Sequence, residues 1–287
     1  MTSNRLLAWT MSALLGLALT ACGEITEEEK NADLGPLNAI DATNLTEIML
    51  TVSDPGDAVD FFQASLAEEP DRVDFKRGLA KSLARAGRYR ESARGYEEMD
   101  EAGEMERDDR LVFAEVLVRE NQWPQAEAQL SLVSEGDADY RYNLLNALIA
   151  DNYQNWEVAD RYYANARSLT TRPVAVLNNW GVSHMSRGEV REAVDIFEEA
   201  VAMDGTSFGP KNNLVIARGL TGNYQLPVMP LNEEERAQLY HNLALVALRS
   251  GNQDIAKGLL QQAVDEHPRY FPAAADKLAA LQGIVER

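Results

Sequence analysis

The sequence predicts an all-α protein, a right-handed solenoid of paired antiparallel helices, and two observations lead to this prediction. A pattern of small and aromatic residues recurs about every 34 residues, a period typical of repeats made of two helices. Within each half of a repeat, apolar residues follow the i, i+3, i+4 spacing of one helix face. Because one helix pair cannot bury its apolar face alone, neighbouring pairs must supply the core. The first helices of the pairs are expected to line the concave surface and the second helices the convex one.

Residues 1–21 are predicted to be a signal peptide. The segment carries one positive charge, Arg5, followed by an apolar run from Leu6 to Ala18. That run is shorter than the roughly 20 residues that a membrane-spanning helix needs. A charged start and a short apolar centre are typical of a secretory signal.

The segment Leu19-Thr20-Ala21-Cys22 resembles the lipobox of bacterial lipoproteins. The resemblance implies cleavage between Ala21 and Cys22 and a diacylglycerol on the Cys22 sulfur, with two or three acyl chains forming a firm anchor. The alternative is an incidental thiol behind an ordinary signal. Cys22 is the single cysteine of the chain, so no internal disulfide can form and the fold depends on its core.

The residues after Cys22 bear on where the protein resides. In Gram-negative lipoproteins an Asp directly after the acylated cysteine favours the inner membrane, whereas here Gly23 and Glu24 follow. The resemblance therefore implies, for a Gram-negative source, the outer membrane and its periplasmic face. Residues 22–38 are rich in Glu and Asn and are expected to form a flexible acidic tether.

The chain is strongly acidic, with a formal net charge of −19 that becomes −20 when Arg5 is removed with the signal. This charge argues against nucleic-acid binding and against a basic membrane-surface patch. It favours protein partners that have basic surfaces.

The clearest repeat covers residues 174–207 and has the spacing of the tetratricopeptide family, which it resembles. Small residues in that family stand where two helices cross, and Gly181 and Ala193 occupy such positions here, with Phe197 filling the space beside them. Gly188 is expected to take a left-handed conformation in the turn between the two helices.

The same pattern recurs along residues 39–287, which are predicted to form the solenoid. Segments 73–106, 107–139, 140–173 and 237–270 repeat it, and 39–72 repeats mainly its second half. The predicted packing residues of the set are Ala80, Ala114, Ala147, Gly181, Ala193, Phe197, Ala244 and Ala256.

One repeat departs from the pattern. The unit that begins near Phe208 has a first helix but lacks the second, because prolines at 227 and 230 within residues 225–231 would break a helix. The helices are expected to resume at Asn232, a favourable cap followed by three glutamates. Residues 271–287 are predicted to form a closing helix.

No catalytic chemistry is apparent, and neither an enzyme activity, a metal nor a cofactor is predicted. The three histidines, His184, His241 and His267, fall in separate repeats, and no phosphate-binding or nucleophile motif occurs. His184 is interpreted as a packed residue. The run Glu233–Glu235 is interpreted as a solvated helix end, because consecutive residues on a helix point in different directions.

Asparagines are the candidate binding residues. They fall at equivalent places in the first helices of three successive segments, where an amide could hold the backbone of an extended partner; the set is Asn178, Asn179, Asn212, Asn213 and Asn242. The alternative is that they only follow the repeat consensus. Apolar contacts could come from Val182, Met185, Ile216, Leu245 and Leu248, and contacts to an acidic ligand from Arg77, Lys81 and Arg119.

The lipobox, acidic tether and helical hairpins together resemble the TadD-like lipoproteins of tight-adherence (Tad/Flp) pilus systems. The most telling stretches are 176–182 and 210–217. The resemblance implies a periplasmic factor that binds a secretin segment and assists its assembly. Two alternatives remain: a scaffold for outer-membrane protein insertion or for peptidoglycan enzymes, and an enzyme with a hidden site.

Overall fold

The computed structural model describes residues 39–134, 136 and 138–283. The predicted signal peptide, Cys22 and the acidic tether lie outside these residues. The chain divides into two compact units, residues 1–47 and 48–287. Within the described ranges the regular structure is helical throughout, which confirms the predicted all-α solenoid.

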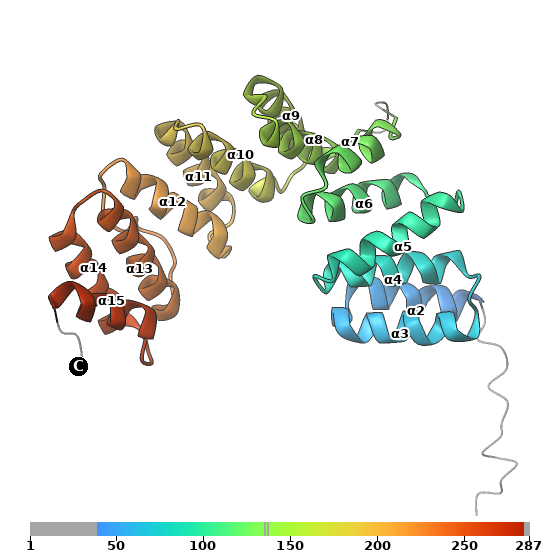
Figure 1. The fold of residues 1–287 in the computed structure, drawn as a ribbon, viewed down its shortest axis with the longest axis horizontal. Coiled ribbons are helices and arrows are strands. Elements are labelled where there is room, and N and C mark those ends of the chain that lie inside the picture. Colours follow the sequence, from blue (N-terminus) through green and yellow to red (C-terminus); the bar gives the residue numbers. More distant parts are fainter. Residues whose placement is uncertain (1–38, 135, 137, 284–287) are drawn as a thin grey trace, which may run out of the picture. The chain divides into compact units, whose positions relative to one another are not determined.

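Antiparallel helix pairs follow one another along the chain (Figure 1). Repeats predicted to begin at residues 73, 107, 140 and 174 begin with helices at those residues. The helices of the described ranges are α2 (Ala39–Thr51), α3 (Pro55–Glu68), α4 (Val73–Arg85), α5 (Tyr89–Glu101), α6 (Arg107–Arg119), α7 (Trp123–Ser131), α8 (Tyr140–Asn152), α9 (Trp156–Ser168), α10 (Val174–Ser186), α11 (Val190–Met203), α12 (Phe208–Leu220), α13 (Glu233–Arg249), α14 (Gln253–Glu266) and α15 (Pro272–Gln282).

Local sequence fixes where the helices start and turn. Asn232 caps α13 through a reciprocal capping box with Glu235, as the acidic helix start predicts. The helix therefore begins at Glu233, about one turn before the predicted repeat boundary at 237. Gly188 has φ of 84°, which confirms the left-handed turn. Asn121 takes the same conformation in its turn without being glycine, with φ of 60°.

Small residues allow the helices of a pair to approach closely. A Cβ atom added to Gly181 of α10 would lie 2.5 Å from Cε1 of Phe197 on α11, so only glycine fits there. A similar close approach occurs between successive repeats, where Gly78 of α4 lies against Phe62 of α3, the second helix of the preceding repeat. The predicted packing residues are buried, namely Ala80, Ala114, Ala147, Gly181, Ala193, Phe197, Ala244 and Ala256.

The segment between α12 and α13 stands where a second helix is missing. Leu226, Met229 and Leu231 pack against a buried cluster of α13 and α14, while Val228 is fully exposed. The apolar side chains thus replace part of the missing helix. Three of the seven side chains of residues 225–231 therefore pack against the core, and each of the three is partly buried.

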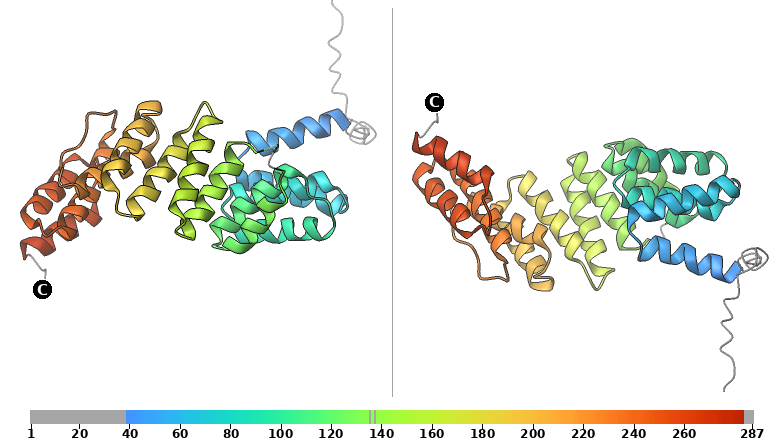
Figure 2. Two further views of the ribbon diagram at one scale, coloured as in Figure 1. Left: turned by 90° about the horizontal axis from the view of Figure 1, so that it is seen from above. Right: turned by 90° about the horizontal axis from the view of Figure 1, so that it is seen from below.

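Helix α15 closes the last pair, since Ala274 and Leu278 join the cluster formed by α13 and α14. Figure 2 shows α13, α14 and α15 side by side at this end. Across the described ranges, the helices are each too short or too polar to cross a membrane.

Candidate functional site

The predicted asparagines bond mostly to one another. Asn213 of α12 donates through Nδ2 to Oδ1 of Asn178 on α10 at 2.9 Å. Asn242 of α13 donates through Nδ2 to Oδ1 of Asn212 on α12 at 2.6 Å. These two bonds tie together the first helices of three successive units.

Two further hydrogen bonds involve the side-chain amides of these asparagines. Asn212 donates to Oδ1 of Asn213 at 3.4 Å, and Gln238 donates to Oδ1 of Asn242 at 3.0 Å. Asn213 and Asn242 therefore have both a donor and an acceptor engaged within the chain. The structure gives them a role in joining helices, and their role in holding a partner's backbone stays a prediction.

Asn179 is different from the other four asparagines. Its Nδ2 donates only to the carbonyl oxygen of Ala175, one turn earlier in α10, at 2.8 Å. Its side chain lines a hollow on the first-helix side of the solenoid, together with residues of α6 and α8. Of the predicted asparagines, it is the one best placed to meet a partner there.

The predicted apolar contacts are only partly available. Val182 is 44% exposed. Met185 packs against the cluster of α11 and α12, and Leu248 packs against the cluster of α13 and α14. These two side chains contribute to the core.

The predicted basic residues have unequal surroundings. Arg77 donates through Nε to both carboxylate oxygens of the fully buried Asp109, at 2.9 and 2.7 Å, so it is a structural residue. Lys81 lies 3.9 Å from the same carboxylate. The side chain of Arg119 is 59% exposed and 4.0 Å from Glu115. Lys81 and Arg119 thus remain accessible, whereas Arg77 is engaged by Asp109.

Two hollows lie along successive first helices. The first hollow, of about 280 Å³, is formed by residues of α4 and α6 with Leu50, Tyr89 and Arg141. The second, of about 490 Å³, is formed by residues of α6, α8 and α10 with Asn121 and Trp123. Their walls are largely apolar, and the principal apolar side chains are Leu50, Ala84, Val112, Val116, Val118, Leu144, Leu145 and Leu148.

The two hollows meet at one ion pair. Glu115 of α6 and Arg141 of α8 line both of them, and Arg141 Nη2 lies 3.4 Å from Glu115 Oε2. We call the joined surface, from Lys81 on α4 to Asn179 on α10, the first-helix groove. Its residues Lys81, Arg119 and Asn179 were predicted from the sequence as candidate binding residues. The apolar walls were not predicted, because these side chains also fit the repeat's core pattern.

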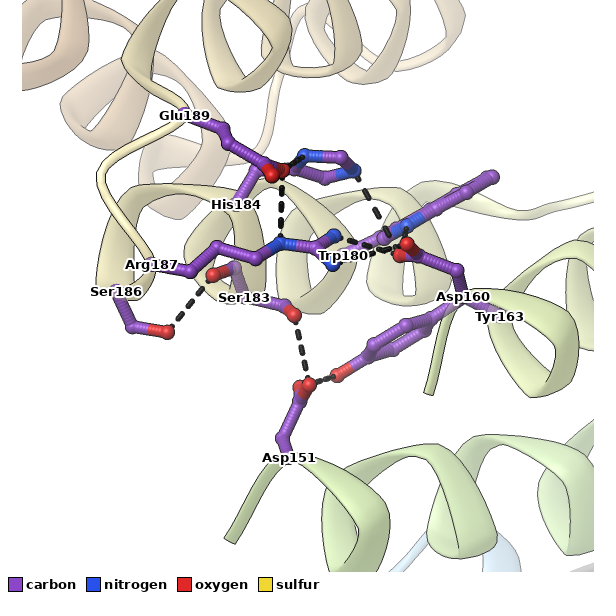
Figure 3. A network of polar contacts seen from close by, with 9 residues as sticks. All are labelled: Asp151, Asp160, Tyr163, Trp180, Ser183, His184, Ser186, Arg187 and Glu189. Atoms are coloured by element: carbon purple, nitrogen blue, oxygen red, sulfur yellow. Dashed lines mark hydrogen bonds and ion pairs between the residues drawn. The ribbon is translucent and has the colours of Figure 1, made fainter. Parts of the chain in front are cut away.

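A network of polar side chains fixes α8, α9 and α10 relative to one another, and two of these helices, α8 and α10, line the second hollow (Figure 3). Asp151 of α8 accepts hydrogen bonds from Tyr163 on α9 and Ser183 on α10, both at 2.7 Å. Asp160 of α9 accepts from Arg187, just after α10, at 2.6 and 2.9 Å. Three helices that carry or support the groove are thereby held by directed bonds.

His184 belongs to this network. Its ring lies over Trp180 at 6.0 Å between centroids, and Nδ1 lies 2.7 Å from Oε2 of Glu189 (Figure 3). Trp180 in turn donates to Asp160 at 2.7 Å. The packed interpretation of His184 agrees with these contacts.

Asp151 should give the fold a distinctive pH dependence. Its burial raises the pKa of the carboxyl above the ordinary value of 3.8, despite the hydrogen bonds from Ser183 and Tyr163. A raised pKa means that its contribution to stability is complete below pH 3.8 and is lost as the pH rises through the folded-state pKa. We expect Asp151→Asn, which cannot ionise, to stabilise the protein more at pH 7 than at about pH 4.

Urea unfolding of both proteins at the two pH values measures this difference. The pH dependence of the wild-type free energy of unfolding does not isolate the effect of Asp151. Asp160 and Asp139 have lowered pKa values, so their contributions to stability change with pH in the opposite direction. A stability difference between variant and wild type that is the same at both pH values would contradict the prediction.

The side chains of the first-helix groove are of kinds that can bind a polypeptide. In the described ranges no three His, Cys, Asp or Glu side chains come together in a way that could hold a metal ion. The first-helix groove instead offers apolar walls, an amide and cationic side chains, which are groups that recognise a polypeptide segment.

Comparison with known proteins agrees with the fold. Residues 174–210 match the model of the tetratricopeptide repeat, and this region contains the repeat that was clearest in the sequence. A search of curated proteins found no match. The match, together with the helical pairs, shows a tetratricopeptide-repeat fold.

Solved structures of similar fold include a tetratricopeptide repeat protein from Parabacteroides merdae, 12% identical with a TM-score of 0.55 and 88% of each chain covered. A chain of the APC/C hetero-tetramer Cut9–Hcn1 is 15% identical with a TM-score of 0.55; 90% of this chain is covered. The present chain spans 50% of the length of that chain. At these identities the likenesses establish the fold alone.

Proposed function

We propose that this protein is a lipid-anchored scaffold on the periplasmic face of the outer membrane, where it assists assembly of a Tad/Flp pilus secretin. The single observation that carries the binding role is the first-helix groove. Apolar side chains of four successive first helices line two hollows that are open to a partner. The pilus assignment is supported by the resemblance of the lipobox and the stretches 176–182 and 210–217 to TadD-like lipoproteins.

The groove suits a partner segment because it is already formed. Its helices are joined by packed pairs and by the Asp151 and Asp160 networks, so little ordering of the scaffold is needed on binding. Apolar side chains of the partner would gain about 25 cal/mol for each Å² buried in the hollows. Binding alone is thus sufficient for the proposed role, with no catalytic group required.

The lipid would determine where the bound partner is delivered. In this proposal, residues 1–21 are removed and acyl chains on Cys22 hold the scaffold at the outer membrane, with the acidic residues 22–38 as a tether. A secretin segment bound in the groove would then be brought to the membrane in which the secretin assembles.

The test uses cells that lack this chain and carry it again as wild type, as Cys22→Ser, or as Arg119→Glu with Asn179→Arg. We expect secretin multimers in the outer membrane to require the wild type. Cys22→Ser should lose membrane attachment, and the groove variant should remain attached but fail to support multimers. Arg161→Glu is the control, because Arg161 is 67% exposed on α9, a second helix.

Secretin multimers that form normally without this chain would contradict the pilus role. If outer-membrane protein insertion or peptidoglycan synthesis failed instead, the alternative scaffold functions would replace it. Normal processing and membrane attachment of Cys22→Ser would contradict the lipid anchor.

A further inference from the structure

The charge of the first-helix groove is opposite to that of the whole chain. Its ionisable acid and base side chains are Lys81, Arg85, Arg119, Arg141 and the single acid Glu115. The chain as a whole has a formal net charge of −19. A local excess of cations in so acidic a protein gives the groove a charge preference of its own.

Three of the four cations of the groove, Lys81, Arg119 and Arg141, have only long ion-pair contacts within the part of the chain that the structure describes. Arg141 and Arg119 lie 3.4 and 4.0 Å from Glu115, and Lys81 lies 3.9 Å from Asp109. Several other arginine–carboxylate pairs in the described ranges are shorter, for example 2.6 Å between Arg187 and Asp160 and 2.7 Å between Arg77 and Asp109.

The fourth cation, Arg85, has partners of its own, and the acids Asp109 and Glu115 each face more than one cation, which accounts for the long contacts of the other three. Arg85 donates to the carbonyl oxygens of Met49 and Ser53 at 3.0 and 2.9 Å, so it supports the turn after α2. Asp109 is already bound by Arg77. Glu115 is shared by two arginines, so one carboxylate faces two guanidinium groups. Lys81, Arg119 and Arg141 therefore keep donors for a further carboxylate.

We propose that the segment which binds in the first-helix groove is an acidic and apolar peptide of a partner protein. This proposal rests on the proposed function and specifies the chemistry of its partner. Bulky apolar side chains of the peptide enter the two hollows, against Val112 and Val116 in the first and Leu144 and Leu148 in the second. A carboxylate between them replaces the long contacts of Arg141 with short charge-assisted hydrogen bonds.

The same arrangement rejects basic segments. A lysine or arginine near Arg141 and Lys81 would meet like charges, which costs binding free energy and slows association. The groove therefore selects a partner segment by two properties, namely apolar side chains that fit the walls of the hollows and a negative charge where the hollows meet.

The test selects binders from a displayed library of random peptides, using the full chain in detergent as target. We expect the retained peptides to be enriched in Glu and Asp flanked by Leu, Ile or Phe. The same selection on Arg141→Glu should lose that enrichment in acids. The matched control is Arg161→Glu, because Arg161 also has a long ion pair, 3.8 Å to Glu157, but lies on α9 outside the groove.

A retained peptide then allows a quantitative test by fluorescence polarisation. Arg141→Gln should weaken its binding about tenfold or more, and replacing the peptide's Glu by Gln should remove the difference between the two proteins. Retained peptides that are neutral or basic, binding unaffected by Arg141, or no retained peptide would overturn the inference. The proposed function fails by a separate result, namely normal secretin multimers in cells without the chain.

Discussion

Replacing Arg77 by Ala should lower the free energy of unfolding by about 3–5 kcal/mol, the usual cost of leaving a buried charge without its partner. Asp109 has a side chain only 1% exposed, and Arg77 donates to both of its oxygens. After the substitution, the carboxylate keeps only the backbone N–H of Glu106 at 3.0 Å and Lys81 at 3.9 Å. Chemical denaturation of the two proteins measures the loss.

The control for this prediction is Arg88→Ala. Arg88 also forms a close pair, 2.6 Å from Glu91, but both side chains are 42% exposed and water can replace the partner. We expect little change from it. Equal effects of the two substitutions would show that Arg77 and Asp109 are not a buried structural pair.

Replacing Gly181 by Leu should lower the free energy of unfolding by about 1–3 kcal/mol, because overpacking forces neighbouring side chains from their preferred rotamers. Even the first added atom would lie 2.5 Å from the ring of Phe197, whose side chain is fully buried. Thermal unfolding followed by circular dichroism measures the effect. Phe197→Leu in the same chain should recover part of the loss by making room.

Gly258→Ala tests whether this effect comes from crowding or from loss of glycine in a helix. Gly258 lies in α14, and a Cβ there would meet no atom within 4 Å. Since Ala is a better helix former, we expect this substitution to be neutral or to stabilise by up to about 1 kcal/mol. If Gly181→Leu were as harmless as Gly258→Ala, the helix crossing described here would be wrong.

Repeat boundaries could be predicted from the sequence because they depend on local residue types. Helices α4, α6, α8 and α10 begin at the predicted residues, and α13 begins after the predicted cap Asn232. Residues 225–231 were correctly predicted to lack a helix, since proline limits the local backbone. The packing of their side chains was not foreseen, because it depends on α13 and α14.

Contacts between repeats were missed, yet many share one sequence separation. Arg77 with Asp109 and Ser183 with Asp151 are each 32 residues apart. So are Arg167 with Glu199 and Arg85 with Ser53. Complementary side chains separated by nearly one repeat length were thus a usable signal, because stacked repeats bring equivalent positions together.

The candidate site was only partly predictable for a related reason. Equivalent placement of the asparagines was visible in the sequence, but the bonds among Asn178, Asn213, Asn212 and Asn242 depend on how α10, α12 and α13 pack. The walls of the groove could not be told from core residues by spacing. Its cationic character was partly predicted through Lys81 and Arg119, and Arg141 was missed.

Site-specific photocrosslinking in living cells can establish whether a partner protein binds in the first-helix groove. A photoreactive residue is placed at Arg119 or Asn179 in the groove, and at Arg161 or the exposed Glu198 on second helices. We predict that the two groove positions crosslink to one common protein and that the two second-helix positions do not. Crosslinks to that protein from Arg161 or Glu198, with none from Arg119 and Asn179, would show that the partner binds to the second helices and not in the groove.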